Sequence, residues 1–499
     1  IYTEGNIALI HTRLAIQDIH NGEQPLHFKD YSIVFNGEIY NHLELRKELN
    51  EFQFKTQCDT ETLLYLYIKY GEKMFQHIDG MFAFAIWDKK ANKIFLARDR
   101  AGKKPLYIYQ HNQSLLFSSE LTALRQGISG LSINTDAIES YLRLGFFAQE
   151  ITPYKDVHVL KAGHYCNIDI QSKEIHQKPY FDIKDYYKVQ KTLSFEEALT
   201  SVDSALHKSI KDRLSSSDLE VGAFLSGGID SSLIVAIASQ YNNNLKTFTV
   251  KFDGAYDESH LAKLTAQKYN TTHTELEISV NLKNDIETIL SNYGQPFMDS
   301  SAVPSYYVSQ AAKEHVTVVL NGDGADELFA GYRRYVPAQN SIISYVKHLS
   351  FLLQVLPKPQ NKKSIYNYLH RLLAMSKKEH LDFYLSSTSD IFEDAYNIKN
   401  NPITNNINEY IKAIDLEPLS KMLFLDFNLL MFSDLLIKMD IATMSHSLEG
   451  RSPFLSKYML ELAPTIPGKY KIKGTQTKYI LRELARKYLS PELINQPKR

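Results

Sequence analysis

Residues 220–232 read Glu-Val-Gly-Ala-Phe-Leu-Ser-Gly-Gly-Ile-Asp-Ser-Ser. The apolar run that closes at Leu225 predicts a buried strand, and the pattern of residues 231–239 predicts a helix. Between them lie Gly227 and Gly228, which let the backbone of a tight turn approach a bound group closely. The stretch therefore predicts a strand, a glycine turn and a helix in succession, the repeating unit of a parallel sheet.

The turn has the chemistry of a phosphate site. Backbone N–H groups and the positive end of the following helix attract anions, and the hydroxyl groups of Ser226, Ser231 and Ser232 add further donors. Asp230 is placed to hold Mg²⁺ against a pyrophosphate. The alternative is a tight turn capped by an Asp-Ser pair, but the whole S-G-G-x-D-S-S string after a buried strand favours the phosphate site. The string resembles the loop of ATP enzymes that release pyrophosphate, and the chain has no lysine-containing Walker motif.

Strands and helices continue to alternate on both sides of this turn. A helix is predicted over residues 195–214, a strand over 246–252, a helix over 260–269 and a buried strand over 316–320. Such alternation is typical of a doubly wound parallel sheet. The remainder, about 335–499, is predicted to be mostly helical.

A second acidic loop follows the strand over 316–320. Residues 321–327 read Asn-Gly-Asp-Gly-Ala-Asp-Glu. Acidic side chains at the carboxyl end of a parallel strand face the ligand crevice of such sheets. Asp326 is therefore a candidate to share Mg²⁺ with Asp230, and Asp323 is a candidate to orient or deprotonate an amine nucleophile. The alternative is a turn with solvated carboxylates.

The N-terminal third of the chain has a different, strand-rich pattern. Strands are predicted over residues 31–35, 81–87, 93–97 and 114–118, and helices over about 41–50 and 60–70. The pair Asn36-Gly37 is predicted to form a turn, and the strands over 81–87 and 93–97 a hairpin. We expect a domain of mostly antiparallel sheet over 1–182, a polar irregular linker over 183–193 and a second domain over 194–499.

Composition excludes several classes of function. With 499 residues and a net charge of −1, the chain has no electrostatic footprint for nucleic acid or for an anionic membrane surface. No apolar run approaches the length of a membrane span, and no signal peptide is visible. The two cysteines, Cys58 and Cys166, fit a reducing compartment, and we expect a cytoplasmic protein.

Taken together, these strings resemble the glutamine-hydrolysing asparagine synthetases of the bacterial B type. In the second domain the similarity covers residues 225–232, 256–258, 296–301, 320–332, 438–440 and 444–455. The resemblance implies ATP and Mg²⁺, and an ATP site that also includes Leu225, Val250, Asn321 and Gly322.

The same resemblance assigns roles to two further side chains. Lys478 lies where the family has its catalytic lysine, although a lone lysine is ordinarily solvated; such a lysine stabilises a developing oxyanion or an α-phosphate. Asp323 lies where the family commonly has a glutamate tied to formation of the adenylate, so its carboxylate is one methylene shorter. Asn321 and Gln295 also depart from the common pattern.

The first domain resembles the class II glutamine amidotransferases, which have an N-terminal-nucleophile fold of stacked antiparallel sheets with helices. The strings concerned are residues 11–14, 36–41, 59–61, 97–100 and 117–120. The resemblance implies a glutamine site made of Arg13, Asn36, Gly37, Glu38 and Asp59. An arginine suits the carboxylate of glutamine and carboxylates suit its ammonium, while Asn36 is a candidate for an oxyanion hole. Taken singly, these residues also fit a turn asparagine and surface salt bridges.

That type of domain requires an N-terminal cysteine whose own α-amino group acts as base. This sequence begins with Ile1, and the family pattern places the cysteine roughly 35 residues earlier. We therefore expect a sequence cut at both ends. As printed, the chain is expected not to hydrolyse glutamine, although free ammonia remains a possible nitrogen donor.

The implied function is a C–N bond-forming ligase that amidates aspartate through a β-aspartyl-adenylate, with glutamine as the source of ammonia and a homodimer as the implied assembly. One alternative is an enzyme of the same architecture with another acid, such as a β-lactam synthetase-like or peptide-modifying enzyme. Another is a non-catalytic sensor of glutamine or nucleotide. The sequence does not fix the acceptor acid, for which Arg451 and Glu449 are candidates of opposite charge.

Overall fold

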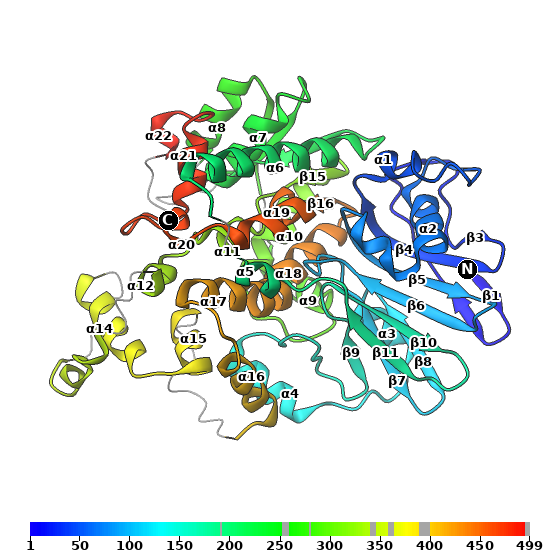
Figure 1. The fold of residues 1–499 in the computed structure, drawn as a ribbon, viewed down its shortest axis with the longest axis horizontal. Helices are drawn as coiled ribbons and strands as arrows, with labels where there is room; N and C mark the ends of the chain where they lie inside the picture. The colour runs from blue at the N-terminus through cyan, green and yellow to red at the C-terminus, as the bar shows by residue number, and fades with distance from the viewer. Residues whose placement is uncertain are drawn as a thin grey trace.

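The computed structural model describes residues 1–189, 192–251, 259–278, 281–339, 346–357, 364–388 and 400–494. Figure 1 shows a strand-rich N-terminal part, in blue and cyan, beside a C-terminal part in which helices surround a second sheet. We refer to residues 1–182 as the N-terminal part and to the residues from 194 onward as the C-terminal part.

The N-terminal part is built on a six-stranded antiparallel sheet with the order β11-β10-β6-β5-β4-β3. The strands are β3 (Leu26–Phe28), β4 (Tyr31–Ile39), β5 (Gly80–Asp88), β6 (Lys93–Arg98), β10 (His164–Asp169) and β11 (Ile175–Pro179). Side chains alternate along β4, so that Ile33 and Phe35 pack against helix α2 (Asp59–Tyr70) and Val34 packs on the opposite face.

A three-stranded antiparallel sheet covers that opposite face. It consists of β7 (Tyr107–His111), β8 (Ser114–Ser118) and β9 (Val157–Val159), in the order β8-β7-β9. The predicted hairpin, formed by β5 and β6, and the stacked antiparallel sheets are confirmed. The smaller elements are β1 (Tyr2–Glu4), β2 (Ile7–Leu9), α1 (His42–Arg46), α3 (Leu121–Gly127) and α4 (Thr135–Leu144).

The pair Asn36-Gly37 does not form the predicted turn. Strand β4 continues through both residues and pairs with β5 as far as Ile39, which lies opposite Gly80. Gly37 has a φ of +146°, and a Cβ atom on it would lie 2.0 Å from the carbonyl oxygen of Met81. Glycine is therefore required for the close approach of two strands, not for a reversal of the chain.

The C-terminal part contains a five-stranded parallel sheet with the order β14-β13-β12-β15-β16. Its strands are β12 (Val221–Phe224), β13 (Lys246–Val250), β14 (Thr272–Leu276), β15 (Val318–Leu320) and β16 (Glu449–Arg451). Both faces are covered, because Val318 and Leu320 pack with helices α6 (Phe195–Ser215) and α7 (Ile229–Ala238), whereas Val319 packs with α10 (Ala302–Lys313). The predicted doubly wound sheet is confirmed.

Two of these strands escaped prediction. Strand β14 alternates polar and apolar residues only weakly, and β16 has just three residues, Glu-Gly-Arg. The predicted strand over 246–252 ends at Val250, and Phe252 lies outside the described residues, as do residues 256–258.

The predicted helical remainder is also confirmed. Over the described part of 335–499 it includes α12 (Val336–Gln339), α14 (Ile365–Ser376), α15 (His380–Thr388), α16 (Pro402–Lys412), α17 (Pro418–Leu425), α18 (Leu436–Met444), α19 (Lys457–Leu462), α20 (Gly468–Lys471), α21 (Tyr479–Ala485) and α22 (Pro491–Ile494). Helices α8 (Ser259–Tyr269), α9 (Leu282–Ser291) and α11 (Ala325–Phe329) lie before this remainder, and α8 is the helix predicted over 260–269. None of the helices in the described ranges is long and apolar enough to cross a membrane.

The segment predicted to be an irregular linker contains a helix instead. Helix α5 (Ile183–Lys188) begins after Asp182, whose side chain accepts a hydrogen bond from the backbone of Lys184. Ile183 and Tyr187 are buried in the core of the C-terminal part. These two residues are one helical turn apart and pack the helix onto that core. The polar residues around them made the helical periodicity hard to recognise in the sequence.

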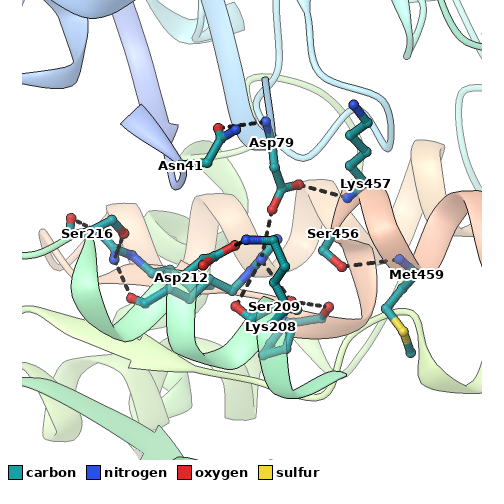
Figure 2. A network of polar contacts seen from close by, with 12 residues as sticks. Asn41, Asp79, Lys208, Ser209, Asp212, Ser216, Ser456, Lys457 and Met459 are labelled. Carbon is teal, nitrogen blue, oxygen red and sulfur yellow. Dashed lines mark hydrogen bonds and ion pairs between the residues drawn. The ribbon is translucent and has the colours of Figure 1, made fainter. Parts of the chain in front are cut away.

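Buried polar contacts hold the two parts together. Figure 2 shows Asp79, from the N-terminal part, directed toward Lys457 at the start of α19. The Asp79 carboxylate accepts a 2.7 Å hydrogen bond from the backbone N–H of Lys457 and lies 3.4 Å from the guanidinium of Arg213 on α6. Both ion-pair side chains are only 2% exposed, so the contact fixes the relative placement of the two parts.

Candidate functional site

The strand order creates a topological switch point in the parallel sheet. From β12 the chain builds outward through β13 and β14, and it then returns to add β15 and β16 on the other side of β12. The carboxyl ends of β12 and β15 therefore lie at the switch-point crevice, the usual ligand position in such sheets by general rule. The predicted ATP residues follow these ends: Leu225 to Ser232 follow β12, Val250 ends the neighbouring β13, and Asn321 and Gly322 follow β15.

The glycine turn after β12 is held by its own serines. Gly227 has a φ of +76°, which favours glycine. The hydroxyl groups of Ser226 and Ser231 lie 3.1 Å apart, and the Ser231 hydroxyl donates to the carbonyl of Gly228 at 3.2 Å. Helix α7 begins at Ile229, so the N–H groups of its first turn have no partner within the helix and are available to an anion.

Lys478 joins the two acidic loops. Its ammonium contacts Oδ2 of Asp230 in the first turn of α7 and lies 2.9 Å from Oδ1 of Asp326 in α11. The lysine is 6% exposed. Burial lowers the pKa of Lys478, but the two carboxylates more than offset this, and the net shift is upward. The side chain is therefore an ammonium ion at neutral pH, between residues that are far apart in sequence.

The backbone around this lysine is unusual. Lys478 has a φ of +53° and donates its N–H to the carbonyl of Ala330, which itself has a φ of +56°. A Cβ atom on the next residue, Gly331, would lie 1.7 Å from Oδ1 of Asp326 and 2.2 Å from Cε of Lys478. Gly331 is thus a residue beside the site that sequence reasoning did not single out, although it lies within the stretch 320–332 that carries the family resemblance.

The residues at the crevice fit a nucleotide and Mg²⁺. Among the described residues, Oδ1 of Asp230 and Nδ2 of Asn321 are buried without a hydrogen-bond partner. A Cβ atom on Gly322 would approach Cβ of Asp230 to 3.4 Å, so the glycine keeps this space narrow but open. Within the described ranges no group of three or more His, Cys, Asp or Glu side chains can hold a metal. Mg²⁺ commonly takes one or two carboxylates and completes its shell with phosphate oxygens and water.

Asp323 does not join this cluster. Its Oδ2 lies 3.1 Å from Nζ of Lys103, a residue of the N-terminal part, and accepts a hydrogen bond of 3.3 Å from the hydroxyl of Ser452. The single proton of this hydroxyl is shared with Oδ1 of Asn321, which lies closer, at 2.7 Å. The second acidic loop is therefore held from two sides, by Ser452 directly after β16 and by the loop after β6.

The five residues predicted to bind glutamine all line one small cavity of about 70 Å³. Asn36, Gly37 and Glu38 come from β4, Asp59 begins α2, and Arg13 lies in the preceding loop. Met444 and Glu449 of the C-terminal part complete the lining. A larger cavity of about 430 Å³ between the two parts contains none of the predicted site residues.

The carboxylates in the small cavity are strongly perturbed. Burial raises the pKa of Asp59 to about 7, although the backbone N–H of Ile39 donates to its Oδ2 at 2.8 Å. Burial and the neighbouring Asp59 raise the pKa of Glu38 well above its usual value, against the opposing effect of Arg451. These acids lack a full complement of positive charge, which a ligand ammonium would provide.

The side chain of Arg13 is engaged in the same part of the chain. Its guanidinium donates to the carbonyls of Asp18 at 2.9 Å and Ile19 at 3.2 Å. Cys58 also lines the cavity, but burial raises the pKa of its thiol. Cys58 is therefore a poor nucleophile here.

Arg451 and Glu449 do not face the crevice as acceptor-binding residues. The Arg451 guanidinium is fully buried, lies 3.2 Å from Oε2 of Glu38, and donates from Nε to Glu449 at 2.8 Å. Strand β16 thus directs Arg451 toward Glu38, which lines the small cavity, and the next residue, Ser452, toward the acidic loop. Sequence spacing gave no indication of this arrangement, because the partner Glu38 lies in the other part of the chain.

Comparison with known proteins identifies both parts. The sequence profile of the asparagine synthase family matches residues 201–499, and the glutamine amidotransferase domain profile matches residues 1–181. Asparagine synthetase [glutamine-hydrolyzing] 1 of Bacillus subtilis is 35% identical, with 97% of this chain and 78% of the relative covered. Asparagine synthetase [glutamine-hydrolyzing] 3 of the same organism is 28% identical, over 100% of this chain and 80% of the relative. Amidase chyE of Penicillium rubens is also 28% identical, over 98% and 80%. The chain belongs to the asparagine synthase family and carries a glutamine amidotransferase domain before its synthase domain.

Proposed function

We propose that this chain is an ATP-dependent amide ligase that converts aspartate to asparagine with nitrogen from glutamine. The observation that carries the proposal is the Lys478 ammonium held between Asp230 and Asp326 at the switch point of the parallel sheet. The names of two B. subtilis relatives, glutamine-hydrolyzing asparagine synthetases 1 and 3, support the choice of both substrates.

The first proposed step activates the side chain of aspartate. One oxygen of its carboxylate attacks the α-phosphorus of ATP, the bond from that phosphorus to the bridging oxygen breaks, and pyrophosphate leaves with the electron pair. The product is β-aspartyl-adenylate. The first N–H groups of α7 and the ammonium of Lys478 are the groups proposed to stabilise the growing negative charge.

Asp230 and Asp326 are the proposed ligands of Mg²⁺, which when bound neutralises charge on phosphate oxygens. The unpartnered Oδ1 of Asp230 supports this assignment. Lys478 lies between the two carboxylates and offsets their mutual repulsion, so it holds both side chains near each other.

The second proposed step forms the amide. Ammonia attacks the acyl carbon, the acyl–oxygen bond breaks, AMP leaves with the electron pair, and the nitrogen loses a proton. Asp323 is the residue proposed to orient ammonia and to accept that proton. Its placement after β15 at the crevice supports this role.

The small cavity of the N-terminal part is the proposed glutamine site. Arg13 would bind the α-carboxylate, Glu38 and Asp59 the α-ammonium, and Asn36 with Gly37 the side-chain amide. The raised pKa values of the two acids support a cationic group as their partner. Ammonium chloride is the nitrogen donor in the tests below, so that the synthase reaction is measured separately from the proposed glutamine site.

The rival proposal keeps this chemistry and changes the acid. One relative over 98% of the chain is named an amidase, so membership of the family leaves the acid open. The residues proposed to bind glutamine lie together in one cavity. Their grouping favours an enzyme that takes its nitrogen from glutamine over an enzyme that has lost its glutamine site.

The test is pyrophosphate release with ATP, Mg²⁺, ammonium chloride and one acid at a time. Aspartate is compared with glutamate, with β-alanine derivatives and with no acid. The proposal predicts release with aspartate that matches the asparagine formed. Release only with another acid supports the rival enzyme, and no release with any acid supports a sensor.

A further inference from the structure

Two loops from different parts of the chain meet at one ion pair. Nζ of Lys103, in the loop after β6, lies 3.1 Å from Oδ2 of Asp323, in the loop after β15. The lysine side chain is 5% exposed and that of the aspartate 22% exposed. The pair is therefore largely shielded from solvent. In such an environment a carboxylate without a cationic partner costs free energy.

The loop that carries Lys103 is rigid. The Asp99 carboxylate accepts hydrogen bonds from the backbone N–H groups of Lys103 at 2.9 Å and Lys104 at 3.0 Å. A Cβ atom on Gly102, which has a φ of +72°, would lie 2.5 Å from the ring of Phe432 in the C-terminal part. The loop is thus fixed internally and packed closely on its neighbour, so Lys103 is presented from a defined position.

The other side of Asp323 is also fixed. The Ser452 hydroxyl lies 3.3 Å from the same oxygen, Oδ2, and shares its single proton between that oxygen and Oδ1 of Asn321 at 2.7 Å. Both donors approach one oxygen of the carboxylate, which leaves Oδ1 as the oxygen to meet a substrate. Lys103 therefore determines which oxygen of the Asp323 carboxylate remains for a substrate.

We infer that Lys103 is a positioning residue for Asp323, supplied by the amidotransferase domain to the synthase site. The inference rests on the proposed function, because it gives Asp323 a role toward ammonia and the acyl group. Its consequence is that the synthase site is complete only when the two domains are docked, since the cation that orients its carboxylate belongs to the other domain.

A double-mutant cycle tests this inference. Lys103→Met removes the charge at similar length, Asp323→Asn removes the carboxylate charge, and the double variant combines both changes. In the ammonium-dependent reaction, Lys103→Met is expected to lower kcat roughly 10- to 100-fold, with KM for ATP changed less than about twofold. Lys103→Arg is expected to restore most of the rate, because a cation is again present.

The decisive comparison is between backgrounds. If Lys103 acts through Asp323, Lys103→Met has no further effect in the Asp323→Asn variant. An equal loss in both backgrounds, or full activity of Lys103→Met in the otherwise unchanged chain, overturns the inference.

A matched control comes from Lys208→Met. Lys208 also reaches across the two parts, to Glu44 at 3.5 Å, but at the exposed surface. This variant is expected to keep its rate.

A wild-type chain that is inactive with aspartate but active with another acid contradicts the proposed substrate alone, and the cycle is then measured with that acid. A wild-type chain that is inactive with every acid removes the inference together with the proposed function.

Discussion

Nζ of Lys478 lies 2.9 Å from Oδ1 of Asp326, and the same ammonium contacts Asp230. The lysine reaches them from the first residue before α21, in a left-handed backbone conformation. The segment before α21 is thereby joined to the first turn of α7 and to α11, beside the strands β12 and β15 where the strand order reverses. A buried cation therefore lies between two carboxylates at the switch point of the parallel sheet.

Replacing Lys478 with Met is expected to lower kcat for pyrophosphate release about 100-fold or more, because the group proposed to stabilise the α-phosphate charge is lost. The measurement is steady-state pyrophosphate release with ammonium, aspartate and ATP. Lys473→Met is the matched control, since Lys473 is exposed and lies in the same segment. Wild-type activity of Lys478→Met contradicts the assignment.

Gly331→Ala is expected to destabilise the chain by roughly 1–3 kcal/mol and to abolish most activity, because its methyl group overlaps Asp326 and Lys478. Thermal unfolding and the pyrophosphate assay measure the two effects. Gly127→Ala is the control, because no atom lies within 4 Å of its added Cβ. Equal melting temperatures for both variants contradict the close packing described around Lys478.

Asp59→Asn is expected to change the pH dependence of stability. Asp59 has its pKa raised to about 7 in the folded chain by burial, against about 4 in an unfolded chain. Between these values the unfolded state loses the proton first, so folded wild type loses stability as pH rises through this window. The variant does not show this loss. Its free energy of unfolding relative to that of wild type therefore rises by roughly 2 kcal/mol between about pH 5 and about pH 7.

Thermal unfolding of both proteins at the two pH values checks this prediction. Asp185→Asn is the control, because its side chain is 70% exposed and lies 3.7 Å from Lys188 at the surface. Parallel stability curves for wild type and Asp59→Asn show that Asp59 is already ionised in the cavity, and would remove the argument for a ligand ammonium there.

Arg451→Met is expected to destabilise the fold by about 3–5 kcal/mol, because Glu38 and Glu449 are left as buried carboxylates without their cation. The expected observation is an unfolding transition at lower temperature, with the larger effect at high pH, where Glu38, whose pKa is raised by burial, becomes ionised. Arg143→Met removes a partly exposed arginine–carboxylate pair, with Asp382 at 2.6 Å, and is expected to change stability by less than about 1 kcal/mol. Equal effects of the two variants contradict the buried charge network.

Local patterns predicted much of this architecture from the sequence. The strand, glycine turn and helix at residues 220–239 were visible because an apolar run, two glycines and capping residues are adjacent in the chain. The same reasoning failed at Asn36-Gly37, where a glycine demanded by an approaching strand has the composition of a turn. A pair such as Asn-Gly has the residues that a turn requires, and this is visible in the sequence. Whether the chain reverses there depends on the strand that pairs with it, which the local sequence does not reveal.

The long-range contacts of the site were not predictable in this way. Resemblance located Lys478, but nothing in its neighbourhood indicated Asp230 and Asp326 as its partners. Lys103 has the local appearance of a solvated loop lysine, and only the docking of the two domains places it against Asp323. Arg451 likewise has its partner Glu38 across the interface. Such pairs depend on tertiary geometry that no spacing rule encodes.

The transfer of oxygen from aspartate to AMP tests the central claim most directly. Aspartate labelled with ¹⁸O in its side-chain carboxylate is incubated with ATP, Mg²⁺, ammonium chloride and the chain, and the AMP is analysed by mass spectrometry. Because the attacking oxygen stays on phosphorus when ammonia displaces AMP, the account predicts one ¹⁸O atom in AMP for each asparagine formed. Unlabelled AMP, or asparagine formed with ADP and phosphate in place of AMP and pyrophosphate, would contradict it.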